Sequence, residues 1–253
     1  MINTGSIAAI LVLFMGSFQQ QANAKIIAYP CSAGLSSVYS VTATSHGVTI
    51  NVPVTFHPNS QGKVSFAWFA FSGTVDIKIT VNQTVDTYQL SPTDYAIPST
   101  SSRKDINFTI DKPRKLVLRK VNSLVEELFI FADTLEANPP QSGSKGVFNI
   151  TNYGAFSETG DATSAIQQAI DNASSYPDDG VAFVPSGIYH VNSTIYMKSN
   201  TALYLSPGAV IDFGSGSYDD KTALHVQNVN NAKIFGRGIF LGTNADFLHM
   251  IST

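Results

Sequence analysis

Short apolar segments alternate with turn-forming residues along most of this chain. From residue 35 to about residue 136, apolar and polar residues alternate in short runs, which predicts about eight strands joined by turns. A series of short strands over roughly 100 residues is typical of a β-sandwich. We therefore expect residues 25–136 to form an all-β sandwich domain. The strands are predicted at residues 38–43, 48–56, 63–71, 75–81, 85–90, 106–110, 115–121 and 127–131.

The pattern is interrupted at residues 137–146, where apolar residues become scarce and Pro139 and Pro140 stand side by side. Such a stretch is typical of a linker, so we expect a domain boundary there. One amphipathic helix is predicted after it, and Asp161 or Thr163 can cap its first turn. Its apolar stripe consists of Ala162, Ala165, Ile166, Ala169, Ile170 and Ala173.

Three related segments follow the helix, at residues 183–189, 204–210 and 234–240. Each is a short apolar strand, a turn with a glycine (Gly187, Gly208 or Gly238) and a second strand. A unit that returns after about 20 to 30 residues indicates a β-solenoid. One coil cannot bury its apolar face alone, so coils stack, and we expect the helix to cover the open end of the stack.

From Val147 onward, the chain resembles the pectate-lyase-like superfamily of right-handed parallel β-helices. The likeness runs through Tyr-Gly-Ala at 153–155, Ala-Ile-Gln-Gln-Ala-Ile-Asp at 165–171, and the three repeats above. The nearest members are the polygalacturonase-type and dextranase-type glycoside hydrolases, and the dextranase type also carries a β-sandwich before the helix. Residues 147–253 are therefore expected to be the first coils of such a β-helix. One departure is that residues 157–163 lack the acidic pair that the family usually has there.

The resemblance implies the amino-terminal part of a secreted polysaccharide-degrading glycoside hydrolase, acting on a pectin-like or glucan polymer. In the family, paired aspartates on later coils protonate the leaving oxygen and activate water with inversion. Up to Thr253 those aspartates have no counterpart, so we assign no catalytic residue and expect this chain alone to be inactive. Three alternatives stay open: a polysaccharide lyase of the same fold, a non-catalytic carbohydrate-binding or surface protein, and a broken gene product without function.

Residues 1–24 are predicted to be a signal peptide, because residues 7–14 are apolar and Ala22-Asn23-Ala24 fits a cleavage site. The mature protein is then expected to be secreted. Cys31 is the only cysteine, so no internal disulfide can form. Glycans could be attached in a eukaryotic host at five Asn-X-Ser/Thr sites, which are Asn82, Asn107, Asn149, Asn172 and Asn192.

Composition, charge and motifs argue against several classes of partner. The net charge is −3 without a Lys/Arg run, so a nucleic-acid partner is not expected. After residue 24 no segment is apolar and long enough to span a bilayer, so we expect no membrane partner either. The chain has no phosphate-binding loop, nucleophile elbow or zinc motif, hence no cofactor or metal is predicted. The oligomeric state is not predicted.

The residues that could act in catalysis or binding are better explained by structural roles. The pairs Asp178-Asp179 and Asp219-Asp220 lie in turn contexts and are expected in loops. The histidines His46, His57, His190, His225 and His249 show no metal-ligand spacing, and Arg237 is expected to face solvent beside a corner glycine. The aromatic cluster Phe66, Trp68, Phe69 and Phe71 could stack on sugars, but core and inter-domain packing are favoured.

Overall fold

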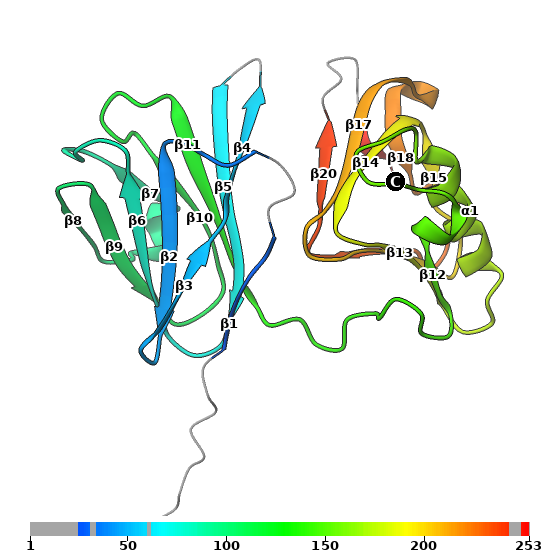
Figure 1. Ribbon diagram of the computed structural model, residues 1–253, viewed down its shortest axis with the longest axis horizontal. Coiled ribbons are helices and arrows are strands. Elements are labelled where there is room, and N and C mark those ends of the chain that lie inside the picture. Colours follow the sequence, from blue (N-terminus) through cyan, green and yellow to red (C-terminus); the bar gives the residue numbers. More distant parts are fainter. Residues whose placement is uncertain (1–24, 31–33, 60–61, 243–248, 253) are drawn as a thin grey trace, which may run out of the picture.

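The computed structural model describes residues 25–30, 34–59, 62–242 and 249–252. The predicted signal peptide at residues 1–24 and Cys31 lie outside the described residues. The fold is mostly β, and one α-helix occurs in the described ranges. Two separate groups of buried apolar residues divide it into an N-terminal region, residues 25–134, and a C-terminal region, residues 147–252. Figure 1 shows the two regions joined by the segment that follows β11.

Two sheets build the N-terminal region. One has the order β1-β5-β11-β10-β7, with β4 also paired to β5, and the other has the order β3-β2-β6-β9-β8. The strands are β1 (Ile26–Ala28), β2 (Tyr39–Ser45), β3 (Val48–Val52), β4 (Val54–Asn59), β5 (Gly62–Phe71), β6 (Val75–Val81), β7 (Gln89–Ser91), β8 (Ser99–Ser102), β9 (Asp105–Ile110), β10 (Arg114–Arg119) and β11 (Glu126–Thr134).

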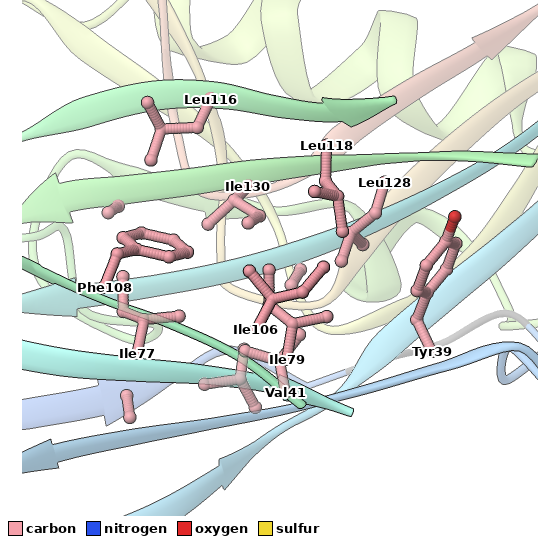
Figure 2. Packing of buried hydrophobic residues seen from close by; sticks show 14 of the residues in the cluster. Tyr39, Val41, Ile77, Ile79, Ile106, Phe108, Leu116, Leu118, Leu128 and Ile130 are labelled. Carbon is pink, nitrogen blue, oxygen red and sulfur yellow. The ribbon is translucent and has the colours of Figure 1, made fainter. Parts of the chain in front are cut away.

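Both sheets bury one face in a common core. In β6, Val75, Ile77, Ile79 and Val81 are buried, because alternate residues of a strand point to the same side. Figure 2 shows Ile77 and Ile79 facing residues of the other sheet, including Leu118 from β10. Roughly 1.5–3 kcal/mol comes from each fully buried side chain of this size.

The observed strands correct the prediction at two places. Residues 48–56 are not one strand, because β3 pairs with β2 in one sheet and β4 pairs with β5 in the other. The break falls at Pro53, which has no N–H to donate to a ladder. The strand predicted at residues 85–90 is reduced to β7, because the backbone N–H groups of Asp86 and Thr87 donate to the Asn122 side chain instead. Strands β1 and β8 were not predicted.

Three parallel sheets wind into the C-terminal region, in the orders β12-β13-β16-β19, β14-β17-β20 and β15-β18-β21. Each turn of the chain contributes one strand to each sheet, so the solenoid character is confirmed. The strands are β12 (Val147–Asn149), β13 (Gly180–Val184), β14 (Gly187–Ser193), β15 (Ile195–Tyr196), β16 (Thr201–Leu205), β17 (Ala209–Ser217), β18 (Thr222–His225), β19 (Lys233–Gly236), β20 (Ile239–Gly242) and β21 (His249–Ser252).

The register of the coils differs by one residue from the repeat seen in the sequence. Gly187 pairs with Ala209, and Val210 pairs with Ile239, so Gly208 lies one position before its expected place. Gly208 has φ +83°, which provides the left-handed turn that leads into β17. The three glycines therefore share a corner of the coil but not a single ladder position.

Helix α1 (Thr163–Ser174) covers the first coil, as predicted. The stripe residues Ala165, Ile166, Ala169, Ile170 and Ala173 are all buried in the C-terminal core. The carboxylate of Asp161 accepts the backbone N–H of Thr163 at 2.9 Å and so satisfies an otherwise unpaired donor of the first turn. In the described residues, no helix is long and apolar enough to cross a membrane.

A polar ladder marks one corner of the stacked coils. Asp179, Asn200 and Asn231 occupy it in successive coils, and all three have left-handed backbone, with φ of 44°, 57° and 55°. The amide of Asn231 donates to Asp179 Oδ1 at 2.9 Å and to Asn200 Oδ1 at 3.3 Å. Asp and Asn tolerate this conformation better than other non-glycine residues, so the ladder fixes how the coils turn here.

Candidate functional site

A groove runs between the two regions of the chain. Its N-terminal wall is the outer face of the β5-β11-β10 sheet, and its C-terminal wall is the outer face of β20. The volume is about 530 Å³, which falls within the size of small-ligand pockets. We call it the interregion groove, and it is lined by Phe66, Trp68, Lys115, Phe131, Gly238, Ile239, Phe240 and Leu241.

Trp68 is held in this groove by a charged network. Its indole Nε1–H donates to Asp133 Oδ2 at 2.7 Å, and Lys115 Nζ donates to Asp133 Oδ1 at 2.6 Å. The ammonium of Lys115 lies 5.0 Å from the ring centre of Phe131 and 5.9 Å from that of Trp68. Tyr29 and Phe131 contact the indole edge-on. The network therefore fixes the orientation of the indole.

The aromatic cluster of β5 is divided between two environments. Phe69 and Phe71 are buried in the N-terminal core, whereas Phe66 and Trp68 are half-buried and line the interregion groove. The alternation of a strand explains this, since Phe66 and Trp68 share one face and Phe69 and Phe71 lie elsewhere. Core packing therefore applies to Phe69 and Phe71, and packing between the regions applies to Phe66 and Trp68.

Arg237 does not face solvent as predicted, and this corrects the sequence-based expectation. It lies half-buried where the regions meet, donating to the hydroxyl of Tyr29 at 3.3 Å and to the carbonyl of Thr134 at 3.2 Å. Burial alone would lower the pKa of Arg237, but the Tyr29 hydrogen bond and the Asp133 charge hold it above its ordinary value. The guanidinium therefore stays charged and ties the N-terminal region to a solenoid corner.

A second polar contact attaches the segment between the regions. The hydroxyl of Tyr204 donates to Glu136 Oε2 at 3.2 Å. Burial, followed by the charge of Glu136, raises the pKa of Tyr204 well above its ordinary value, so the hydroxyl remains a donor. The ring of Tyr204 packs between those of Phe183 and Phe235 in tilted contacts, with ring centres at 5.5 Å and 5.0 Å. Glu136, the last residue of the predicted sandwich, thus contacts the outer face of the solenoid directly before the predicted linker.

His190 is paired with an aspartate that sequence reasoning missed. His190 and Asp212 are opposite each other on the parallel strands β14 and β17, and His190 Nδ1 lies 3.1 Å from Asp212 Oδ2. Leu241, which lines the interregion groove, is the next partner of Asp212 on β20. The pair therefore lies on the same sheet as one wall of the groove. The pair could be predicted only from the register of β14 and β17, which places His190 opposite Asp212.

The aspartate pairs expected in loops are found at turns. Asp219 and Asp220 form the short 3-10 helix η3 (Asp219–Lys221) between β17 and β18, and the Asp219 carboxylate accepts the hydroxyl of Tyr196. The ring of Tyr196 stacks on that of His225 at 5.3 Å. Asp178 and Asp179 precede β13, and Asp179 also bonds to Lys233 at 3.3 Å.

The remaining histidines are scattered. His46 occupies the turn between β2 and β3, and its Nδ1 lies 3.0 Å from Ser45 Oγ. His57 is in β4 and His249 in β21. No group of three or more His, Cys, Asp or Glu side chains that could hold a metal ion occurs within the described ranges.

The five predicted glycosylation sites differ in environment. Asn82, Asn172 and Asn192 are exposed, the first after β6, the second in α1 and the third in β14. Asn149 caps the 3-10 helix η2 (Ile150–Tyr153), because its side chain accepts the backbone N–H of Thr151. Asn107 is half-buried in the middle of β9. Whether glycans are attached stays a prediction.

Comparison with known protein families finds a match in the C-terminal region. Residues 147–252 match the model of the family described as rhamnogalacturonase A/epimerase, pectate lyase-like. These residues comprise the C-terminal region, which forms the parallel sheets described above. A comparison with curated protein sequences finds no match.

Solved structures resemble this chain to different degrees. The dextranase-type structure titled Dex49A from Penicillium minioluteum superposes with a TM-score of 0.53 at 15% identity, covering 83% of this chain and 46% of its own. A family 28 exopolygalacturonase from Yersinia enterocolitica has a TM-score of 0.31 at 15% identity, covering 67% of this chain and 39% of its own. The second score is too low to carry an argument.

The Dex49A likeness extends over both regions, although this chain spans less than half of that structure's length. At such low identity it shows the fold alone. The family match confirms that residues 147–252 resemble pectate-lyase-like proteins, and the Dex49A likeness shows the fold.

Proposed function

We propose that this chain is the amino-terminal part of a secreted polysaccharide-degrading glycoside hydrolase, with a β-sandwich at residues 25–136, a linker at 137–146 and β-helix coils at 147–253. The observation that carries the proposal is the order of the two regions. A two-sheet region precedes a pectate-lyase-like solenoid, and this combination superposes on Dex49A over 83% of the chain.

The chemistry proposed for the whole enzyme is hydrolysis of O-glycosidic bonds. Hydrolysis with inversion needs one carboxylic acid to protonate the leaving oxygen and one carboxylate to activate water on the opposite side of the bond. We place these carboxylates beyond Thr253. The pairs Asp178-Asp179 and Asp219-Asp220 are poor candidates, because Asp179 and Asp219 are already engaged by neighbouring side chains at turns.

The interregion groove is the proposed place where a polymer contacts both regions. Half-buried aromatic side chains supply apolar faces, and the Lys115–Asp133 pair supplies a donor and an acceptor beside them. Sugar rings combine apolar faces with hydroxyl groups, so a wall of this composition suits them. The His190–Asp212 pair would lie along the same wall.

The test compares this chain with a version that continues past Thr253. Each is incubated with dextran and with polygalacturonate, and reducing ends are measured. We expect none from the present chain and release by the longer version. Reducing sugar released by the present chain would contradict the placement of the catalytic carboxylates. Products with ultraviolet absorbance would indicate a lyase instead, and inactivity of both would favour a binding protein.

Secretion and glycosylation belong to the same proposal. The apolar stretch at residues 7–14 and the Ala22-Asn23-Ala24 site support processing before Lys25. N-terminal sequencing of protein secreted by a eukaryotic host should start at Lys25. Retention of the first 24 residues in secreted protein would contradict it.

A further inference from the structure

The outer face of the β3-β2-β6-β9-β8 sheet carries three rows of polar side chains that cross the strands. Strand alternation turns every second residue of β2, β6 and β9 to this face, away from the N-terminal core. The first row is Thr49, Thr44, Asp76 and Thr109; the middle row is Asn51, Thr42, Lys78, Asn107 and Thr100; the third row is Ser40, Thr80, Asp105 and Ser102.

Each of the two flanking rows contains hydrogen bonds between its own side chains. In the first row, Thr44 and Thr49 are joined at 2.8 Å, and the Thr109 hydroxyl donates to Asp76 Oδ1. In the third row, the Thr80 hydroxyl donates to Asp105 Oδ1 at 2.6 Å. These contacts fix the side chains at both borders of the middle row.

The middle row is different, because its side chains make no hydrogen bond or ion pair to other described residues. Thr42, Lys78, Asn107 and Thr100 come from four adjacent strands and line a hollow of about 690 Å³. With strands about 4.8 Å apart, these four side chains extend over roughly 14 Å. The hollow therefore contains a line of free donors and acceptors, and the row on each side of it contains internal hydrogen bonds.

The chemistry of the hollow selects a class of ligand. Threonine hydroxyls and the asparagine amide both donate and accept, as sugar hydroxyls do. Lys78 and Asp76 bring opposite charges, so the lining favours neither an anion nor a cation. Nucleic acid would need clustered cations or aromatic stacking platforms. Lys78 is the single cation among the described lining residues, and Phe108 is buried in the core.

We propose that the middle row binds a neutral polysaccharide chain lying across the strands. This site is separate from the interregion groove, which lies on the other sheet of the N-terminal region. It would hold a polymer without cleaving it. Binding here does not require the proposed hydrolase activity, so the two proposals can fail independently.

Asn107 links the site to the predicted glycosylation. It stands in the middle row and begins the sequence Asn107-Phe-Thr109. A glycan on Asn107 would occupy the hollow. The binding experiment therefore uses protein made in bacteria, which leaves Asn107 unmodified.

The test is affinity gel electrophoresis of the whole chain through gels containing dextran, galactomannan, mixed-linkage β-glucan or polygalacturonate. We expect at least one neutral polymer to retard the protein. Lys78→Ala and Asn107→Ala should each weaken that retardation at least fivefold, with Thr42→Val as a further variant should Asn107→Ala fail to fold. The matched control is Lys145→Ala, an exposed lysine in the segment between the regions that lines neither the hollow nor the interregion groove, which should leave retardation unchanged.

Three results would overturn the proposal. They are retardation by no neutral polymer, retardation by polygalacturonate alone, and retardation that Lys78→Ala weakens no more than Lys145→Ala does. Thermal unfolding of each variant shows whether the change acts on binding or on folding. Reducing ends are measured in parallel, so a failed hydrolase proposal is seen separately from failed binding.

Discussion

Arg237 and Tyr29 are 208 positions apart in the chain, and a hydrogen bond of 3.3 Å joins them where the two regions meet. Arg237 also binds the carbonyl of Thr134, at the end of β11. Arg237, at a corner of the solenoid, therefore contacts the residue that follows β1 and the last residue of β11. Both strands belong to the same N-terminal sheet.

Replacing Arg237 with alanine should loosen the junction while leaving both cores folded. Hydrogen bonds to a charged group contribute about 1.5–3 kcal/mol, and about 1.4 kcal/mol corresponds to a tenfold change in an equilibrium. We expect limited proteolysis within residues 137–146 to become about tenfold faster. Arg103→Ala, at an exposed hairpin turn, is the control and should not change the rate. Equal rates in the two variants would contradict the role of Arg237.

Glu126→Ala should destabilise the N-terminal region. The buried carboxylate accepts the hydroxyls of Ser65 at 2.5 Å and Ser36 at 2.9 Å. Its removal leaves the buried Ser65 hydroxyl without this acceptor, at a cost of about 1–3 kcal/mol in the free energy of unfolding, measured by urea denaturation. Glu126→Gln, which keeps one acceptor, should lose less. Equal losses for both would show that the carboxylate hydrogen bonds are not the cause.

Gly180→Ala should destabilise the contact between α1 and β13. An added Cβ would come within 2.3 Å of the Ala173 carbonyl oxygen, so helix and strand would have to separate. Forcing atoms into a packed core costs about 1–3 kcal/mol, read from the thermal unfolding midpoint. Gly34→Ala is the matched control, because no atom lies within 4 Å of its added Cβ. Similar midpoints for both variants would refute the close approach.

Alkaline pH should weaken the C-terminal region. Burial, followed by the charge of Asp212, raises the pKa of Tyr218 from 10.0 to about 12. The folded state then keeps a proton that the unfolded state loses above about pH 10, so stability is full below that pH and falls as pH rises toward 12. In Tyr218→Phe, urea unfolding measured from pH 9 to 12 should show a shallower decline. An unchanged decline would exclude Tyr218 as its source.

Local patterns predicted the features that depend on neighbours in the sequence. The buried stripe of α1 follows directly from helical spacing, and the bond from Asp161 to Thr163 joins residues two apart. The repeat at 183–189 and 204–210 likewise marks strands that stack in the solenoid.

Features that depend on pairing across the chain could not be predicted in this way. The chain passes from one sheet to the other at Pro53 because β3 and β4 pair with different strands. The backbone N–H of Asp86 donates to Asn122, which is 36 residues away in the sequence. The same holds for the site, since Asp212 becomes visible as a partner of His190 only through the parallel register. Arg237 was wrongly predicted to face solvent, because the acceptors that it binds belong to the N-terminal region and are distant in the sequence.

Trp68 is the only tryptophan in the chain, and its indole lies in the interregion groove with Nε1 bonded to Asp133. Intrinsic fluorescence excited at the indole therefore reports from one known place. Any event that separates the regions, or that brings a ligand against this wall, alters the polarity around a single emitter. The protein thus contains its own spectroscopic probe of the junction, without added label or engineered residue.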